Sequence, residues 1–99
     1  MQGIVIRYSY DGDEAKWRAA TDAFIQAIEN DDAVSGKFRY TVTTGKDGVT
    51  RTHLGRWDSD ETLSTVQSRP YFKTFSDEVQ AMAGDTLKPM RVDIGATTD

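Results

Sequence analysis

Two alternating segments joined by a short turn constrain the fold of this chain more than any other feature. In KFRYTVTT (residues 37–44) apolar and polar residues alternate, and a second such segment, VTRTHLGRW (residues 49–57), follows the turn GKDG. A period of two residues is typical of strands that bury one face, and glycine with aspartate suits the tight turn between them. The sequence therefore predicts an antiparallel hairpin in the middle of the chain.

Further strand and helix patterns flank this hairpin. Residues 3–10 are rich in β-branched and aromatic side chains, and residues 87–95 alternate, which predicts a first and a last strand. Residues 14–30 place their apolar side chains at helical spacing, with Asp11 and Glu14 as the expected capping box. One helix is therefore expected to connect the first strand to the hairpin.

A proline interrupts the second helical segment. Asp58 or Ser59 is expected to cap this segment, and Pro70 is expected to break it, because proline lacks the N–H of an unbroken helix but suits the first turn of a new one. Gly84 is the expected end of the restarted helix. Pro89 in the last strand indicates a place at the edge of the sheet.

The resulting order of elements is βαββαβ in a single domain over residues 1–99. With right-handed crossovers, this order gives a ferredoxin-like α+β fold, in which two helices cover one face of an antiparallel four-stranded sheet. A chain of 99 residues buries only about 60–65% of its unfolded surface, so a second subunit would be a natural way to cover more.

Strand parity assigns the side chains to the two faces of this sheet. If the central turn has two or four residues, even positions before it pair with odd positions after it. The face under the helices is then expected to contain Ile4, Ile6, Tyr8, Phe38, Tyr40, Val42, His53, Trp57, Met90, Val92 and Ile94. The opposite face is expected to be basic, with Arg7, Lys37, Arg39, Arg56 and Arg91 against the single anion Asp93.

Composition excludes several classes of function. The chain contains no cysteine, which rules out disulfides, thiolate nucleophiles and iron–sulfur sites. His53 is the only histidine, so no metal is expected, because a metal site needs several converging ligands. The formal net charge of −4 argues against nucleic acid as a partner. No apolar run could span a bilayer and no N-terminal signal is present, so we expect a cytoplasmic protein with no membrane partner.

Three sequence features near the second helical segment are distinctive. They are Trp57 at a strand end, the helix entry DSDETL at residues 58–63 and the segment SRPYFKTF at residues 68–75. Together with the element order of the whole chain, they resemble the antibiotic biosynthesis monooxygenase-like family. The resemblance implies a homodimer in which two ferredoxin-like units form a dimeric α+β barrel. It therefore favours a dimer interface for the basic face over an anion-binding sheet or a solvated polar surface.

The resemblance also implies a class of function. Similar proteins include cofactor-independent oxygenases of quinols or anthrones, haem-degrading enzymes and proteins of unknown role. Haem-degrading relatives use a histidine in the second helix, where this chain has Val66, so no cofactor is expected. The leading hypothesis is a cofactor-independent monooxygenase that binds a small hydrophobic aromatic or quinol substrate between the sheet and the helices. The alternative is a non-catalytic ligand-binding or interaction dimer.

Three side chains on the helix-facing side of the sheet are candidate catalytic residues. His53 would take a phenolic proton, since its ordinary pKa lies nearest to neutral, and Tyr8 or Tyr40 would stabilise the resulting oxyanion. A lone histidine on a core-facing strand is more often a hydrogen-bonded packing residue, and the two tyrosines are also explained as packing residues with their hydroxyls at the rim. The sequence leaves both interpretations open.

Three further side chains are candidate substrate-binding residues. Trp57 would stack on a flat ring, and Tyr71 and Phe72, which follow Pro70, would extend the same wall. Trp57 is also explained as a core or interface residue. Arg51, at the hairpin end of the same face, is expected to be solvated.

Overall fold

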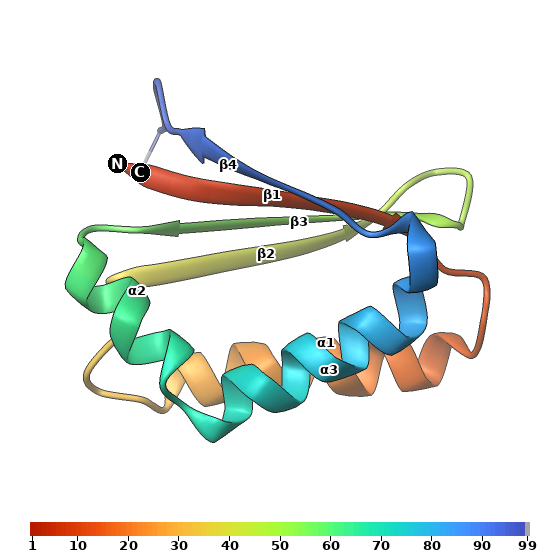
Figure 1. The fold of residues 1–99 in the computed structure, drawn as a ribbon, viewed down its shortest axis with the longest axis horizontal. Helices are drawn as coiled ribbons and strands as arrows, with labels where there is room; N and C mark the ends of the chain where they lie inside the picture. The colour runs from red at the N-terminus through yellow and green to blue at the C-terminus, as the bar shows by residue number, and fades with distance from the viewer. Residues whose placement is uncertain (99) are drawn as a thin grey trace.

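A four-stranded antiparallel sheet forms one layer of the structure, and the helices form the other (Figure 1). The computed structural model describes residues 1–98. The strand order is β2-β3-β1-β4, and all the helices cover the same face of the sheet. The predicted ferredoxin-like α+β fold is therefore confirmed. The strands are β1 (Gln2–Ser9), β2 (Phe38–Thr44), β3 (Thr50–Trp57) and β4 (Lys88–Asp93).

Capping residues set where the helices begin. Asp13 caps α1 (Glu14–Glu29), because its Oδ1 accepts a hydrogen bond from the backbone N–H of Ala15 at 2.9 Å. The predicted capping box with Asp11 was wrong by two residues, since Asp11 lies before this turn. Ser59, one of the two predicted caps, accepts from Thr62 at the start of α2 (Asp60–Gln67).

The predicted break in the second helical segment is confirmed. Pro70 is the first residue of α3 (Pro70–Ala83), separated from α2 by two residues. The short 3-10 turn η1 (Gly84–Thr86) follows, and Gly84 begins it at φ 58°, in the region that favours glycine. The break lets two helical pieces of different direction follow the sheet (Figure 1).

The hairpin has the predicted register. Even positions of β2 pair with odd positions of β3, so Phe38 lies opposite Trp57 and Val42 lies opposite His53. On the other side of β3, Ile6 of β1 also pairs with His53. His53 therefore lies in the central part of the sheet, on the face that the helices cover.

The parity predicted for β4 was wrong. Ile4 pairs with Arg91 and Ile6 pairs with Pro89, so these two β4 residues share the helix-facing side. Met90, Val92 and Ile94 therefore belong to the opposite, outer side: Met90 is 66% exposed, and Val92 and Ile94 lie against Gly3. Arg91 and Asp93, which were predicted on the outer basic face, therefore lie on the helix-facing side. Lys37, also predicted on the outer face, lies just before β2 begins. Pro89 does lie on an edge strand, as predicted.

The error has a physical cause. Apolar residues of β4 were assigned to the helix-facing side because one buried face is the usual reason for alternation. Here the outer face is itself partly apolar, with Leu54 of β3 38% exposed beside Val5 and Met90. The alternation of apolar residues in β4 therefore does not show which side of this edge strand the helices cover.

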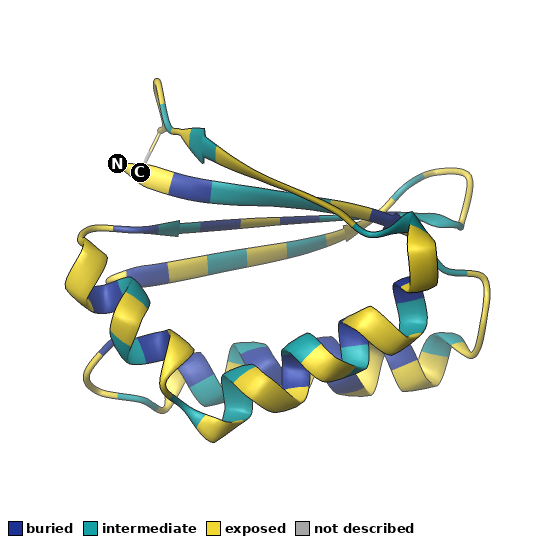
Figure 2. Cartoon of the chain, viewed as in Figure 1, coloured by how far each residue is buried: buried dark blue, intermediate teal, exposed yellow. Residues whose placement is uncertain are grey.

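The core lies between the two layers, where the buried segments of strands and helices face one another (Figure 2). Phe24 of α1 and Phe75 of α3 stack with ring centroids 4.0 Å apart, which joins the two helices. Val34 and Val66 are fully buried, the latter at the position where a haem ligand was sought in the sequence. Within residues 1–98, the helices lack the length and hydrophobicity that crossing a bilayer requires.

Candidate functional site

An apolar cavity of about 140 Å³ lies between the sheet and the helices. Both pieces of the broken helix border it, α2 through Leu63 and α3 through Phe72 and Phe75. Residues at the start of β4 close another side, because Pro89 and Arg91 point toward the helices. Six aromatic side chains form much of the wall: Phe24, Phe38, Tyr40, Trp57, Phe72 and Phe75.

The structure brings three of the six predicted site residues to this cavity. Tyr40, Trp57 and Phe72 line it, whereas His53 and Tyr8 do not. His53 is fully buried, at 0% exposure, and its ring packs against Tyr40 and Phe75 with centroids 5.6 and 5.8 Å away. His53 therefore reaches the cavity only through residues that stand in front of it.

Tyr71, the sixth predicted residue, is held outside the cavity. Its hydroxyl donates to Oδ2 of Asp31 at 2.8 Å, and Arg69 forms an ion pair with the same carboxylate at 2.9 Å. Burial and this carboxylate raise the pKa of Tyr71 to about 12. This cluster fixes the loop after α1 to the start of α3, and so holds the α3 wall of the cavity in place.

A chain of hydrogen bonds connects the cavity wall to the core through His53. The Tyr40 hydroxyl lies 2.9 Å from Nδ1 of His53, and the Tyr8 hydroxyl lies 2.8 Å from Nε2. The indole N–H of Trp17 then donates to the Tyr8 oxygen at 2.8 Å. Strands β1, β2 and β3 and helix α1 thus each contribute one member of this relay.

The donors and acceptors available in the relay determine the direction of its hydrogen bonds. An indole N–H can only donate, and a neutral imidazole has one N–H and one acceptor nitrogen. If Tyr8 donates to His53, then His53 donates to Tyr40, and the hydroxyl proton of Tyr40 remains free. The reverse direction leaves the proton of Tyr8 without an acceptor at 2% exposure, which is costly. We therefore infer that the relay runs from Trp17 toward Tyr40, which lines the cavity.

Burial favours the neutral forms of the three titratable members of the relay. It lowers the pKa of His53 to about 4 and raises the pKa values of Tyr40 and Tyr8 above their ordinary value. A histidine with such a low pKa is a weak base at neutral pH. The arrangement is therefore better suited to stabilise an oxyanion through the Tyr40 hydroxyl than to accept a proton.

The β4 side of the cavity carries an arginine stacked on a tryptophan. The guanidinium carbon of Arg91 lies 5.0 Å from the Trp57 ring centroid, and its Nη2 donates to Oε1 of Gln2 at 3.1 Å. The Trp57 Nε1 is buried and has no acceptor within the described residues. The sequence analysis placed Arg91 on the outer basic face, which was wrong, because its side depends on the register of an edge strand.

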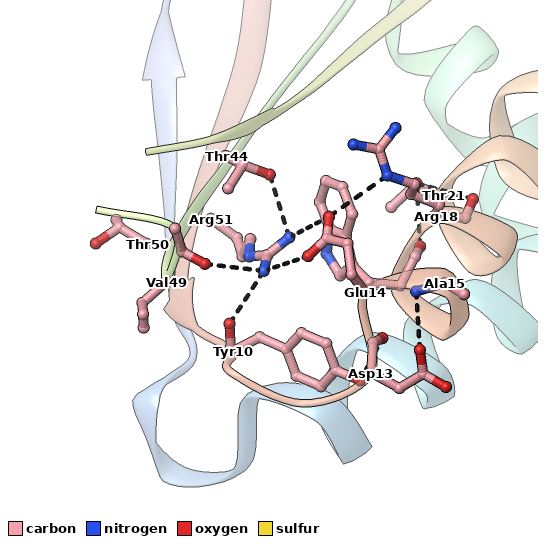
Figure 3. Close-up of polar contacts among 12 residues, drawn as sticks. Tyr10, Asp13, Glu14, Ala15, Arg18, Thr21, Thr44, Val49, Thr50 and Arg51 are labelled. Atoms are coloured by element: carbon pink, nitrogen blue, oxygen red, sulfur yellow. Dashed lines mark hydrogen bonds and ion pairs between the residues drawn. The ribbon is translucent and has the colours of Figure 1, made fainter. Parts of the chain in front are cut away.

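Arg51 forms a second arginine–tryptophan stack at the other end of the helix-facing side. Figure 3 shows its contacts with Glu14 and Thr44. Arg51 was predicted to be solvated, but it is 1% exposed and its guanidinium lies 4.5 Å from the Trp17 ring. Its Nη2 donates to Oε1 of Glu14 at 2.8 Å and to the Tyr10 carbonyl at 3.1 Å. The hydrogen bond from Arg51 lowers the pKa of Glu14. The prediction failed because Glu14 lies 37 residues away, beyond any local pattern.

The polar clusters do not suggest a metal centre. No group of three or more His, Cys, Asp or Glu side chains in residues 1–98 is arranged to hold a metal ion. The chemistry of the cavity therefore has to be argued from its aromatic wall, the Tyr40 hydroxyl and Arg91.

Comparisons with known proteins bear on the fold. No protein-family model matches the chain, and no curated protein sequence matches it significantly. The solved structure of SnoaB, a cofactor-independent oxygenase from Streptomyces nogalater, superposes with a TM-score of 0.75 at 14% identity, over 97% of this chain and 94% of that one. A putative antibiotic biosynthesis monooxygenase from Deinococcus radiodurans superposes with a TM-score of 0.68 at 14% sequence identity, over 100% of this chain and 97% of that one.

A third structure carries information on assembly. A dimeric ferredoxin-like protein of unknown function from Jannaschia sp. gives a TM-score of 0.66 at 8% identity, over 95% of this chain and all of that one. Likeness at these identities establishes architecture and leaves activity open. The chain therefore shares its ferredoxin-like fold with the Streptomyces, Deinococcus and Jannaschia structures.

Proposed function

We propose that this chain is a cofactor-independent monooxygenase that acts on a small hydrophobic aromatic or quinol substrate in the cavity. The observation that carries the proposal is an aromatic-walled cavity bordered by Tyr40, whose hydroxyl joins the buried His53 relay. An apolar cavity of about 150 Å³ can hold a benzene molecule. The cavity here, at about 140 Å³, suits one aromatic ring, with a second ring extending through the mouth.

The reaction requires only the substrate and O₂. For a naphthohydroquinone, one oxygen atom enters a ring C–H bond to give the hydroxynaphthoquinone, and the other leaves as water with the two hydrogens removed from the substrate. The quinol itself supplies the electrons that reduce O₂. The protein has to bind the ionised substrate, orient it and exclude bulk water.

The residues take distinct parts in this scheme. Tyr40 donates a hydrogen bond to the substrate oxyanion, and His53, Tyr8 and Trp17 act behind it by orienting and polarising that hydroxyl. Trp57 and Phe72 pack against the substrate ring. His53 and Tyr8 are thus positioning residues in this proposal, while Tyr40 is the catalytic one.

An oxygen-labelling experiment tests the proposal. Naphthohydroquinone is mixed anaerobically with the protein, ¹⁸O₂ is admitted, and mass spectrometry follows the label in hydroxynaphthoquinone above the protein-free background. We expect one labelled atom per product, and a rate lower by about a hundredfold in Tyr40→Phe, since one oxyanion donor contributes about 10²–10³. Tyr10→Phe is the matched control, because its hydroxyl donates to the Asp13 carbonyl away from the cavity. Label incorporation that does not depend on the protein, or full activity in Tyr40→Phe, would contradict the proposal.

A non-catalytic ligand-binding dimer is the second candidate. The full burial of His53 behind Tyr40 and Phe75 favours it, because no strong base borders the cavity. The same experiment separates the two candidates: a binding protein takes up the naphthalene ring but incorporates no label.

The outer face of the sheet supports the proposal of a homodimer. Leu54 and Met90 are exposed there next to Val5, and large apolar side chains gathered on one face often mark an interface. A related fold is described as dimeric in the Jannaschia protein. We expect light scattering to give twice the monomer mass, and Leu54→Asp to give the monomer. Lys73→Glu on α3, whose side chain is largely exposed, is the control that should remain dimeric. The cytoplasm, where quinols and O₂ are both accessible, is the location we propose.

A further inference from the structure

The polar side chains that line the cavity include a cation and no acid. Besides Tyr40, the polar residues in the lining are Gln67, Ser76, Gln80 and Arg91, and no Asp or Glu joins them in the part of the chain that the structure describes. The chain as a whole is acidic, with a formal net charge of −4. The cavity lining therefore contains a cation and no acid, while Asp93, two residues along β4 on the same side of the sheet, lies outside that lining.

Arg91 has the geometry of a group ready to bind an anion. Its stacking on Trp57 and its hydrogen bond to Gln2 orient the guanidinium plane. The ion pairs seen within residues 1–98 involve other cations, so Arg91 has no carboxylate partner there. A guanidinium has five N–H donors and binds a carboxylate through two parallel hydrogen bonds, so most of its donors remain available.

The indole of Trp57 lies beside Arg91. Its buried N–H has no acceptor among the described residues, which is an unfavourable state for a polar group. Because this N–H is buried, a ligand held by Arg91 would contact the indole ring and not the N–H itself. The exposed Arg91 guanidinium is thus the donor that favours a ligand with negatively charged oxygen.

Arg91 and Tyr40 lie on the same line across the sheet. Tyr40 pairs with Gly55, Gly55 with Ile4, and Ile4 with Arg91, so the two residues stand on opposite edge strands. Three inter-strand spacings of about 4.8 Å separate their Cα atoms by about 14 Å, and both side chains border the same cavity between them. One flat molecule can therefore present an oxygen to Tyr40 and an acid group to Arg91.

We propose that the substrate is an aromatic acid, whose phenol or quinol oxygen binds Tyr40 and whose carboxylate binds Arg91 at the mouth of the cavity. This inference rests on the proposed function, because it names the substrate class of the same site. Arg91 is the residue that selects this class. The one- or two-ring body fills the apolar cavity, and the carboxylate remains partly solvated beside the exposed guanidinium.

Calorimetric binding of a matched pair of ligands tests the inference. The pair is 6-hydroxy-2-naphthoate and 6-hydroxy-2-naphthamide, which share size and hydroxyl but differ in charge. We expect the wild-type protein to bind the acid at least about tenfold more tightly than the amide, with a preference that shrinks in high salt. Arg91→Gln should abolish the preference by lowering the affinity for the acid without changing the affinity for the amide. Arg91→Lys should keep part of the preference, since lysine has the charge but not the planar set of donors. Arg7→Gln, on the outer face, should keep the wild-type preference.

The outcomes separate this inference from the function on which it rests. Equal affinity for acid and amide, or a preference that survives Arg91→Gln, overturns the inference and leaves the cavity as an oxygenase site for neutral substrates. Acid-selective binding without ¹⁸O incorporation supports the inference and overturns the oxygenase activity. If neither ligand binds, both the inference about the substrate class and the proposed oxygenase site are overturned. Circular dichroism of each variant confirms that the fold is retained.

Discussion

Two arginines on the same face of the sheet are stacked on tryptophans, and within residues 1–98 one of them has a carboxylate partner and the other has none. Arg51 lies 4.5 Å from the Trp17 ring and forms an ion pair with Glu14 (Figure 3). Arg91 lies 5.0 Å from the Trp57 ring and has no carboxylate partner in residues 1–98. The first stack is closed and buried, whereas the second is open to solvent at the cavity.

This difference indicates that the Arg51 stack has a structural role and that the Arg91 stack is available to a ligand. Arg51 uses its donors within the chain, on Glu14 and on carbonyl oxygens of the hairpin and β1 ends, so it ties α1 to the sheet. Arg91 leaves most of its donors for a ligand. A continuous row of side chains connects the two stacks across the helix-facing side: Arg51, Trp17, Tyr8, His53, Tyr40, Phe38, Trp57 and Arg91.

The largest expected difference in the free energy of unfolding is the one between the two arginine-to-alanine variants. Arg51→Ala should lower the free energy of unfolding by about 4 kcal/mol, because it empties a buried site and leaves the Tyr10 and Gly48 carbonyls without their donor. Arg91→Ala should change it by less than about 0.5 kcal/mol, as is usual for an exposed residue. Urea unfolding at neutral pH measures both. Similar losses at the two sites would contradict the distinction between them.

The relay between the stacks predicts a pH dependence. Burial lowers the pKa of His53 from 6.5 in the unfolded chain to about 4 in the folded protein, so the unfolded state binds the proton more readily. The stability is therefore complete above pH 6.5 and is lost as the pH falls toward 4, by about 3 kcal/mol in all. Urea unfolding between these pH values should show this slope in the wild-type protein. His53→Gln, which cannot titrate, should flatten it, and an unchanged slope would mean that other groups are responsible.

The two tyrosines of the relay should differ in what they contribute to stability. Tyr8→Phe removes the acceptor of the buried Trp17 N–H and the donor to His53, so we expect a loss of about 2 kcal/mol. Tyr40→Phe should cost about 1 kcal/mol, because it leaves one buried group unpaired, the N–H of His53, and not two. Thermal and urea unfolding of both variants measure the difference. A larger loss for Tyr40→Phe would reverse the direction inferred for the relay.

The smallest effect is expected from comparing the two tryptophans. Trp17 and Trp57 are both buried, but only Trp17 donates its indole N–H to a partner within residues 1–98. Replacement by phenylalanine removes similar volume at both sites, so Trp17→Phe should be more destabilising by about 1 kcal/mol, the usual contribution of one hydrogen bond. Equal losses in urea unfolding would indicate that the Trp57 N–H has an acceptor in solution.

Sequence patterns were sufficient for the architecture but not for the site. Alternation fixed the register of β2 against β3, and Pro70 correctly marked the helix break, because both depend on local backbone chemistry. Tyr40, Trp57 and Phe72 were identified as candidates and do line the cavity. Local patterns of this kind predict which face a side chain shares when that strand has one covered side.

The remaining features depend on contacts between distant segments. Arg91 could not be placed, because the outer face of β4 is also apolar and the usual parity rule reversed. The partner of Arg51 lies on another element, so no spacing in the sequence predicts its burial. Whether His53 borders the cavity or lies behind Tyr40 is decided by the packing of Phe75 from α3, which alternation cannot show.

A crystal structure of the protein with 6-hydroxy-2-naphthoate tests the central claim most directly. We expect the naphthalene ring between the sheet and α3, its hydroxyl within hydrogen-bond distance of Tyr40 and its carboxylate on the Arg91 guanidinium. The cavity must also be large enough to admit the ring without displacing Phe24 from Phe75. A ligand bound elsewhere, or a ring in the cavity with its carboxylate turned away from Arg91, would contradict the account.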